Sequence, residues 1–197
     1  MDDGNDRDDS WDDDELPDGR AWRRPAGMFI LAPVDGAAGD VIHALQRRFD
    51  PKLAAAHRPH LTLTGSSGVG PIAPDTPLDH VREVVAAIAE NMPAVALRFE
   101  APTRFMQSNI VSLPLDPHGE LRVLHDRLAR SGLAFGPARF TFTPHVTLSF
   151  YPTLTRESAR DLLAVRVSEP GLVRRFLISA TNDPFPPKIL ADIPLAV

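Results

Sequence analysis

The sequence predicts a bilobal α+β fold, in which two similar halves each carry an antiparallel-rich sheet with helices outside and meet at a central groove. Three observations lead to this prediction. Some segments alternate apolar and polar residues with a period of two, whereas others repeat apolar residues at helical spacing. These segments follow one another in an order that mixes strands with helices. The strand pattern Pro-His-[Leu/Val]-Thr-Leu also occurs twice, at residues 59–63 and 144–148.

The first half is expected to begin with a buried apolar strand, which Pro33 and Gly36 bring to an end. Two runs of apolar residues at helical spacing then predict helices, and Asp50-Pro51 and Pro93 stop them. The elements expected here are a strand at 28–32, a helix at 40–49, the first motif strand at 59–64, a loop at 65–71 and a helix at 77–91.

The remainder of the chain is expected to open with a hairpin, because two apolar runs flank a loop between Pro102 and Ser108. An amphipathic helix capped by Gly132 should precede the second motif strand. The expected elements are strands at 95–99 and 110–115, a helix at 118–131, the motif strand within 140–150, a helix at 155–164, and closing strands at 172–180 and 189–197 joined by a turn at 182–187.

The charge of the chain is divided unevenly. Residues 1–18 hold ten of the 26 acidic side chains and one of the 21 basic ones, so this segment carries −9 and the remainder +4. A block of like charge with few apolar residues cannot offset its ordering entropy, so residues 1–20 are predicted to be a disordered acidic tail. A solubilising role is the favoured interpretation, and competition with polyanions for the basic body is the alternative. The folded domain is then expected over residues 21–197.

Several classes of protein are excluded by composition. The chain has no cysteine, which rules out disulfides and thiolate metal sites. No apolar run has the length of a membrane span, and the acidic N-terminus is unlike a signal peptide. The sequence therefore predicts a cytoplasmic protein without a membrane partner.

The two motifs predict a shared arrangement of functional groups. On a strand, positions i and i+2 project from one face about 6.6 Å apart. His60 and Thr62 are therefore expected on one face, and Leu61 on the other; His145 and Thr147 repeat this arrangement. Continuing the period of two places Arg58 and Thr64 with His60, and Ser149 and Tyr151 with His145.

The paired groups suit phosphoryl transfer. Imidazole titrates near neutrality, so one histidine can accept a proton from water while the other donates one to the leaving oxygen. Two threonine hydroxyls can stabilise the charge that grows on the phosphate oxygens. A metal site is disfavoured, because the His57/His60 pair has neither helical spacing nor acidic partners. His43 is expected to be exposed or half-buried, and the histidines at helix ends or polar faces are expected to be solvated: His57, His80, His118 and His125.

The two His-x-Thr-x motifs, each preceded by Pro and followed by Leu, resemble the two-histidine phosphoesterase superfamily. This superfamily includes bacterial RNA 2'-5' ligase-like proteins and cyclic nucleotide phosphodiesterases of RNA processing. The resemblance implies metal-independent chemistry, without a cofactor, on 2',3'-cyclic or 2'-5'-linked phosphates. It also implies that His60 and His145 are the acid and base and that Thr62 and Thr147 bind the non-bridging oxygens. Many relatives have an arginine after the second motif, where this chain has Phe150-Tyr151.

The expected substrates are RNA ends or cyclic nucleotides. Tyr151 is a candidate for stacking on a base, and Arg58 is a second candidate for substrate binding; Arg104 and Arg139 are plausible phosphate anchors. Two alternatives stay open beside hydrolysis: an RNA-end or nucleotide-binding module without turnover, and an RNA 2'-5' ligase working in the reverse direction. Oligomeric state is not indicated by the sequence.

Overall fold

The computed structural model describes residues 27–105, 108–138, 140–151, 153–180 and 187–196. The expected acidic tail, Arg139 and all but the last residue of the turn at 182–187 lie outside these residues. Within them, helices and antiparallel strands are mixed, so the predicted α+β class is confirmed. The separation into two lobes stays an expectation.

Seven of the described strands form one sheet in the order β4-β5-β6-β2-β1-β8-β9, and all neighbours in it are antiparallel. A second sheet contains only β3 and β7. The strands are β1 (Met28–Pro33), β2 (His60–Thr64), β3 (Val95–Leu97), β4 (Thr103–Arg104), β5 (Val111–Pro114), β6 (His145–Ser149), β7 (Gly171–Val173), β8 (Arg175–Ala180) and β9 (Lys188–Pro194).

The two motif strands, β2 and β6, are neighbours at the centre of the large sheet. They pair through Leu61 and Val146, which lie opposite each other. A separate sheet was expected for each half; instead this contact joins the strands of both halves into one sheet. The two motif strands therefore lie side by side in one continuous sheet.

The register of the strands repeats between the halves. Pro33 of β1 lies opposite His60, and Pro114 of β5 lies opposite His145. Each of these pairs contains one register shift, and it falls at the same point, where the strand runs on beyond the motif threonine. The similarity of the two motifs in sequence is thus accompanied by a similar local backbone.

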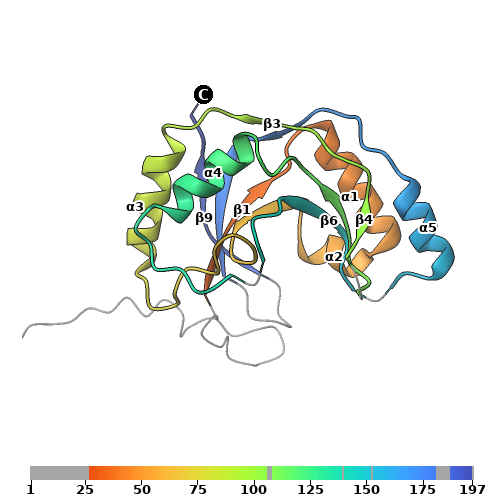
Figure 1. Cartoon of the computed structure of the whole chain (residues 1–197), viewed down its shortest axis with the longest axis horizontal. Coiled ribbons are helices and arrows are strands. Elements are labelled where there is room, and N and C mark those ends of the chain that lie inside the picture. Colours follow the sequence, from red (N-terminus) through yellow and green to blue (C-terminus); the bar gives the residue numbers. More distant parts are fainter. Residues whose placement is uncertain (1–26, 106–107, 139, 152, 181–186, 197) are drawn as a thin grey trace, which may run out of the picture.

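The described residues contain five helices: α1 (Ala37–Phe49), α2 (Pro51–Ala56), α3 (Leu78–Ala89), α4 (Glu120–Ala129) and α5 (Arg156–Ala164). Figure 1 shows α3 and α4 on one side of the molecule and α1 and α5 on the other. Helix α4 contacts β2, whereas α1 contacts β6. The two helices are thus crossed over between the motifs: α4, which precedes β6 in the chain, packs on β2, and α1, which precedes β2, packs on β6.

The elements differ from expectation in two places. The segments expected as hairpin strands at 95–99 and 110–115 meet only at an antiparallel bridge between Phe99 and Leu115, whereas β3 pairs with β7 and the regular hairpin consists of β4 and β5. Helix α2 was not expected, because six residues are too few to display helical periodicity. Asp50 and Pro51 start this helix: the Asp50 carboxylate accepts a 3.0 Å hydrogen bond from the backbone N–H of Leu53.

Among the described residues, no helix has both the length and the apolar character that a membrane crossing needs.

Candidate active site

The four predicted catalytic and phosphate-binding residues form a compact block on one face of the central strand pair. Because Leu61 and Val146 are direct antiparallel partners, the same register sets His60 opposite Thr147 and Thr62 opposite His145. Leu61 and Val146 are fully buried on the core face. The histidines and threonines are half-buried on the other face. Directly opposite Cβ atoms lie about 4.5–5.5 Å apart, so the block has the dimensions of one phosphate and its attacking groups.

Both histidine rings are oriented by the same type of hydrogen bond. The Nδ1 atom of His60 lies 2.8 Å from the carbonyl oxygen of Arg58, and that of His145 lies 2.8 Å from the carbonyl oxygen of Thr143. A carbonyl only accepts, so each Nδ1 carries the proton. In the neutral ring Nε2 is then an unprotonated base, and in the charged ring it is an acid.

The hydroxyls of Thr62 and Thr147 have no hydrogen-bond partner among the described residues. Their neighbours along the strands differ: the Thr64 hydroxyl accepts a bond from the backbone N–H of Ile30, and Ser149 is fully buried beside Asp50. The expectation that Thr64 and Ser149 share the face of the histidines is therefore wrong, and the register shift beside each residue is the physical reason. The motif threonines keep free donors for a ligand.

The two histidines influence each other electrostatically. Burial lowers the pKa of His60 below its ordinary value of 6.5, the hydrogen bond to Arg58 opposes this shift, and the charge of His145 lowers the pKa further. All told, the pKa of His60 is lowered, which favours the neutral ring near pH 7. A neutral base beside a second imidazole is the arrangement that acid–base catalysis needs.

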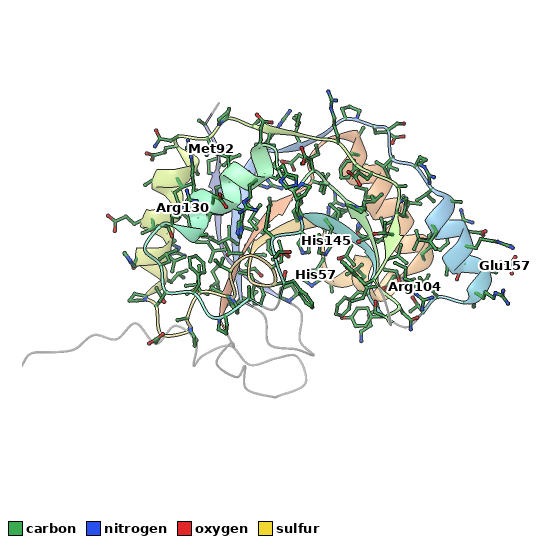
Figure 2. The ribbon with its side chains drawn as sticks, viewed as in Figure 1. His57, Met92, Arg104, Arg130, His145 and Glu157 are labelled. Atoms are coloured by element: carbon green, nitrogen blue, oxygen red, sulfur yellow. The ribbon has the colours of Figure 1, made fainter. Side chains whose placement is uncertain are left out.

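His57 is a third histidine at the site, and the expectation that it is simply solvated was wrong. Its ring centroid lies 5.1 Å from that of His60. Burial and the neighbouring His60 lower the pKa of His57 to about 4. Figure 2 shows His57 and His145 in the same part of the molecule. At pH 7, His57 is therefore a neutral, polar side chain beside His60 at the edge of the site.

Two buried polar side chains from the covering helices form hydrogen bonds with backbone carbonyls of the motif strands. Gln46 of α1 donates a 2.8 Å hydrogen bond to the carbonyl oxygen of Thr147. The Nδ1 atom of His125, on α4, lies 2.7 Å from the carbonyl oxygen of Leu63 and donates to it. Both side chains are at most 3% exposed. His125 was expected to be solvated; it is instead a structural residue, and its bond meets the requirement of a buried carbonyl for a donor.

His125 is enclosed by the loops that flank the motif strands. Its ring stacks on Phe142, with the centroids 4.0 Å apart and the planes 13° from parallel. Gly68 covers the other edge: it has a φ of 75°, and a Cβ atom there would lie 2.2 Å from the ring. Only glycine fits this position without displacing the histidine. The loop at 65–71 thus packs on α4.

Asp50 fixes the segment that follows the second motif. Its carboxylate is fully buried and accepts bonds from the backbone N–H groups of Phe150 (2.7 Å) and Tyr151 (2.9 Å), in addition to that of Leu53. Three backbone donors satisfy the buried charge. The Tyr151 ring lies under the Lys52 ammonium, 3.9 Å from it. The Tyr151 ring is therefore held against α2 by a cation–π contact.

The remaining candidates lie around the block. The Arg58 side chain is exposed and forms a 3.6 Å ion pair with Asp40, so its contact with the site is the carbonyl that orients His60. Phe105 contacts His145 edge to face, with the ring centroids 5.2 Å apart. Arg104 precedes it and is bonded within the hairpin loop. No sequence pattern distinguished Phe105, Gln46 or Asp50, because each acts through a contact between distant segments.

Within the described ranges, no group of three or more His, Cys, Asp or Glu residues is placed to hold a metal ion.

Comparisons with known proteins place this arrangement in context. The profile of the 2'-5' RNA ligase superfamily matches residues 33–179, which include both motifs. No curated protein sequence matches the chain. Among solved structures, E. coli LigT complexed with 3'-AMP is 20% identical, over 88% of this chain and 99% of the LigT chain, with a TM-score of 0.53.

Two further solved structures are similar to a comparable extent. E. coli LigT complexed with NADP+ is 21% identical, over 89% of this chain and 100% of that chain, with a TM-score of 0.52. A structure described as a phosphoesterase is 21% identical, over 88% of this chain and 100% of its own, with a TM-score of 0.51. These likenesses show a shared fold.

Proposed function

The chain belongs to the 2'-5' RNA ligase superfamily, whose activity is of the phosphoesterase type, and on this premise we propose that it hydrolyses 2',3'-cyclic or 2'-5'-linked phosphates of RNA or small nucleotides. One observation carries the proposal: two histidines and two threonines stand in a two-by-two block, with both rings oriented through Nδ1 and both hydroxyls free. That E. coli LigT structures contain 3'-AMP and ATP supports a nucleotide or RNA substrate.

The lowered pKa of His60 supports one division of roles within this proposal. His60 is the general base: its Nε2 removes a proton from water while the water oxygen attacks phosphorus. For a cyclic substrate, the bond from phosphorus to the 2' or 3' oxygen breaks, and His145 transfers the proton on its Nε2 to that oxygen. The products are one phosphomonoester and one hydroxyl. After this step His60 holds the proton taken from water and His145 has lost one. Before the next turnover His60 releases its proton to solvent and His145 takes one up, so the pair consumes no net proton.

Thr62 and Thr147 supply the stabilisation of charge. The hydroxyls stand diagonally across the block from one another, so each can donate to a different equatorial oxygen of the phosphate. Donors that are placed before the reaction and aimed at the growing charge stabilise the transition state more than the ground state. This chemistry needs no cofactor, and we propose that it proceeds without a metal ion.

The test is a panel of substrates treated with the full-length protein in EDTA: 2',3'-cyclic mononucleotides, 2'-5' oligoadenylate and RNA ending in a 2',3'-cyclic phosphate. Phosphorus NMR identifies the products and shows which oxygen leaves. We expect turnover of at least one substrate, and loss of turnover in H60A and H145A. Activity that vanishes in EDTA and returns with zinc or manganese contradicts the metal-independent mechanism.

Two other readings give different outcomes in the same panel. Tight binding of cyclic phosphates without turnover at any pH indicates a binding module. Joining of a 5'-hydroxyl RNA to a 2',3'-cyclic end indicates a ligase, in which the 5'-hydroxyl takes the place of water.

A further inference from the structure

A concave surface lies beside the sheet edge, between the β4–β5 hairpin and α5. Its volume is about 630 Å³. Arg104 and Asn109 line it from the hairpin, and Arg156 and Arg160 line it from α5. Ala159 and Leu163 form part of its apolar floor. We call this surface the arginine groove.

Within the part of the chain that the structure describes, the three arginines of the groove have no acidic partner. The Arg104 guanidinium is fixed by bonds to neutral groups, the carbonyl oxygen of Ser108 (2.6 Å) and the side-chain oxygen of Asn109 (2.9 Å). Arg156 and Arg160 make no hydrogen bond or ion pair with any described residue. Three guanidinium groups thus lie at one groove without an ion pair to a described carboxylate, which is the electrostatic signature of a site for an anion.

The charges of α5 are separated between its faces. Arg156 and Arg160 are four residues apart, so they lie one turn apart on the face that lines the groove. Glu157 and Asp161 are also four residues apart, but neither lines the groove. Figure 2 shows Glu157 on the outer side of α5, away from Arg104. The helix therefore presents cations to the groove and carboxylates to solvent.

The groove is connected to the catalytic block through the edge strand. Arg104 lines the groove, and the next residue, Phe105, contacts the ring of His145. Strand β4 is two strands from β6 in the sheet, a separation on the order of 10 Å. A polymeric ligand that extends from the catalytic block toward this edge would pass Phe105 and reach the groove within a few of its repeating units.

We propose that the arginine groove binds the phosphodiester backbone of an RNA strand whose terminal phosphate lies between His60 and His145. This inference rests on the proposed function and specifies its substrate as an oligonucleotide. Guanidinium groups match phosphate oxygens in geometry and bind them in pairs of hydrogen bonds. The exposed Phe105 ring suits stacking of an unpaired base, so the bound strand is single.

The experiment compares R156Q/R160Q with the wild-type full-length chain on two substrates, a 2',3'-cyclic mononucleotide and a single-stranded hexanucleotide with the same terminal group. R122Q/R130Q is the matched control: it removes the same charge from an exposed position of α4 and from the exposed C-cap residue of that helix. Figure 2 shows Arg130 on the far side of the molecule from Arg104. Thermal melting of each variant verifies folding.

We expect R156Q/R160Q to lower kcat/KM for the hexanucleotide, relative to the mononucleotide, by about tenfold or more, mainly through KM, because each lost arginine removes charge-assisted bonds. The slope of log KM against log salt concentration should decrease by about 1.4, since a single strand contributes about 0.7 for each phosphate neutralised. The control variant should match the wild type. Equal losses in both double variants, or an unchanged ratio, overturn the proposal while leaving hydrolysis of the mononucleotide established.

A binding measurement tests the role of the arginine groove independently of the proposed hydrolytic function. If no substrate is turned over, fluorescence anisotropy with a 3'-phosphorylated hexanucleotide still tests the groove: weaker binding by R156Q/R160Q alone supports it, and equal binding by all variants overturns it. Polyaspartate of equal charge serves as the competing polyanion. If it binds as tightly as the hexanucleotide and with the same dependence on the two arginines, the groove is a site for acidic peptides and the proposal is wrong.

Discussion

Gln46, on α1, forms a hydrogen bond with the backbone of Thr147. The Thr147 hydroxyl lies on the other face of the sheet, among the proposed catalytic groups. The amide Nε2 donates a 2.8 Å bond to the Thr147 carbonyl oxygen, and the side chain is 2% exposed. The amide oxygen of Gln46 is buried and accepts no hydrogen bond from any described residue. This residue therefore positions a proposed phosphate ligand without touching the phosphate.

Replacing Gln46 tests that positioning role. In Q46E the donor becomes a carboxylate facing a carbonyl oxygen, so we expect a loss of stability above the roughly 1–3 kcal/mol that an unpaired buried group costs. Q46M removes the same donor together with the unpaired oxygen, so it should cost less. Denaturant unfolding measures both, and kcat of the folded Q46M should fall with little change in KM. Equal stability of Q46E and wild type contradicts this account.

The stability of the protein should decrease in mild acid because of His57. Its pKa is about 4 in the folded chain and 6.5 ordinarily. A lowered folded pKa means that the unfolded chain binds a proton first, so the stabilisation is complete above pH 6.5 and is lost as the pH falls toward 4. Denaturant unfolding at pH 7, 5.5 and 4 should show a smaller loss for H57Q than for wild type. An identical decline in both proteins would falsify the assignment to His57.

Much of this fold could be predicted from local pattern. The motif strands have a strict period of two, and α3 and α4 have complete apolar stripes, so their existence follows from residues close in sequence. The partner of β3 could not be predicted in this way. Strands β3 and β7 are short and apolar, and which strands pair is decided by packing between segments far apart in the chain.

In the candidate site, too, local sequence pattern identified some residues, whereas others depend on contacts between distant segments. His60, Thr62, His145 and Thr147 were found because their spacing repeats. The roles of His125 and Asp50 were hidden, because a buried histidine and a buried carboxylate are recognised by the carbonyl or N–H groups that they meet. The low pKa of His57 likewise has its cause in burial and in His60, which depend on the folded chain.

Deletion of residues 1–20 should leave the melting temperature nearly unchanged. The prediction rests on composition, because the segment is dominated by acidic residues and offers little apolar surface for burial. Differential scanning calorimetry of the truncated and full chains provides the measurement. A tighter affinity of the truncated chain for RNA would support competition between the acidic segment and polyanions, whereas a markedly lower melting temperature would contradict the prediction.

The two motif threonines should contribute through their hydroxyls alone. T62V and T147V keep the branched shape but remove the donor, so each should lose at most about 2.7–4 kcal/mol of transition-state stabilisation, seen as a lower kcat. T62S and T147S keep a hydroxyl and should restore most of the activity. If serine and valine variants are equally impaired, the threonines act through packing, and the proposed contact with the phosphate oxygens is wrong.

The last prediction concerns the division of labour between His60 and His145. Activity should follow a bell-shaped pH profile, whose acidic limb lies below pH 6.5 because the pKa of His60 is lowered and the base must be neutral. The charge of His145 contributes to that shift, so in H145Q the His60 ring should titrate at a higher pH, which NMR of the imidazole protons measures directly. H60A and H145A should each lose about 10²–10⁴-fold in kcat, and the double variant should lose far less than the product, because the two groups act as one unit. A His60 titration that is indifferent to H145Q, or losses that multiply in the double variant, would show that the two rings work independently and would remove the basis for paired acid–base catalysis.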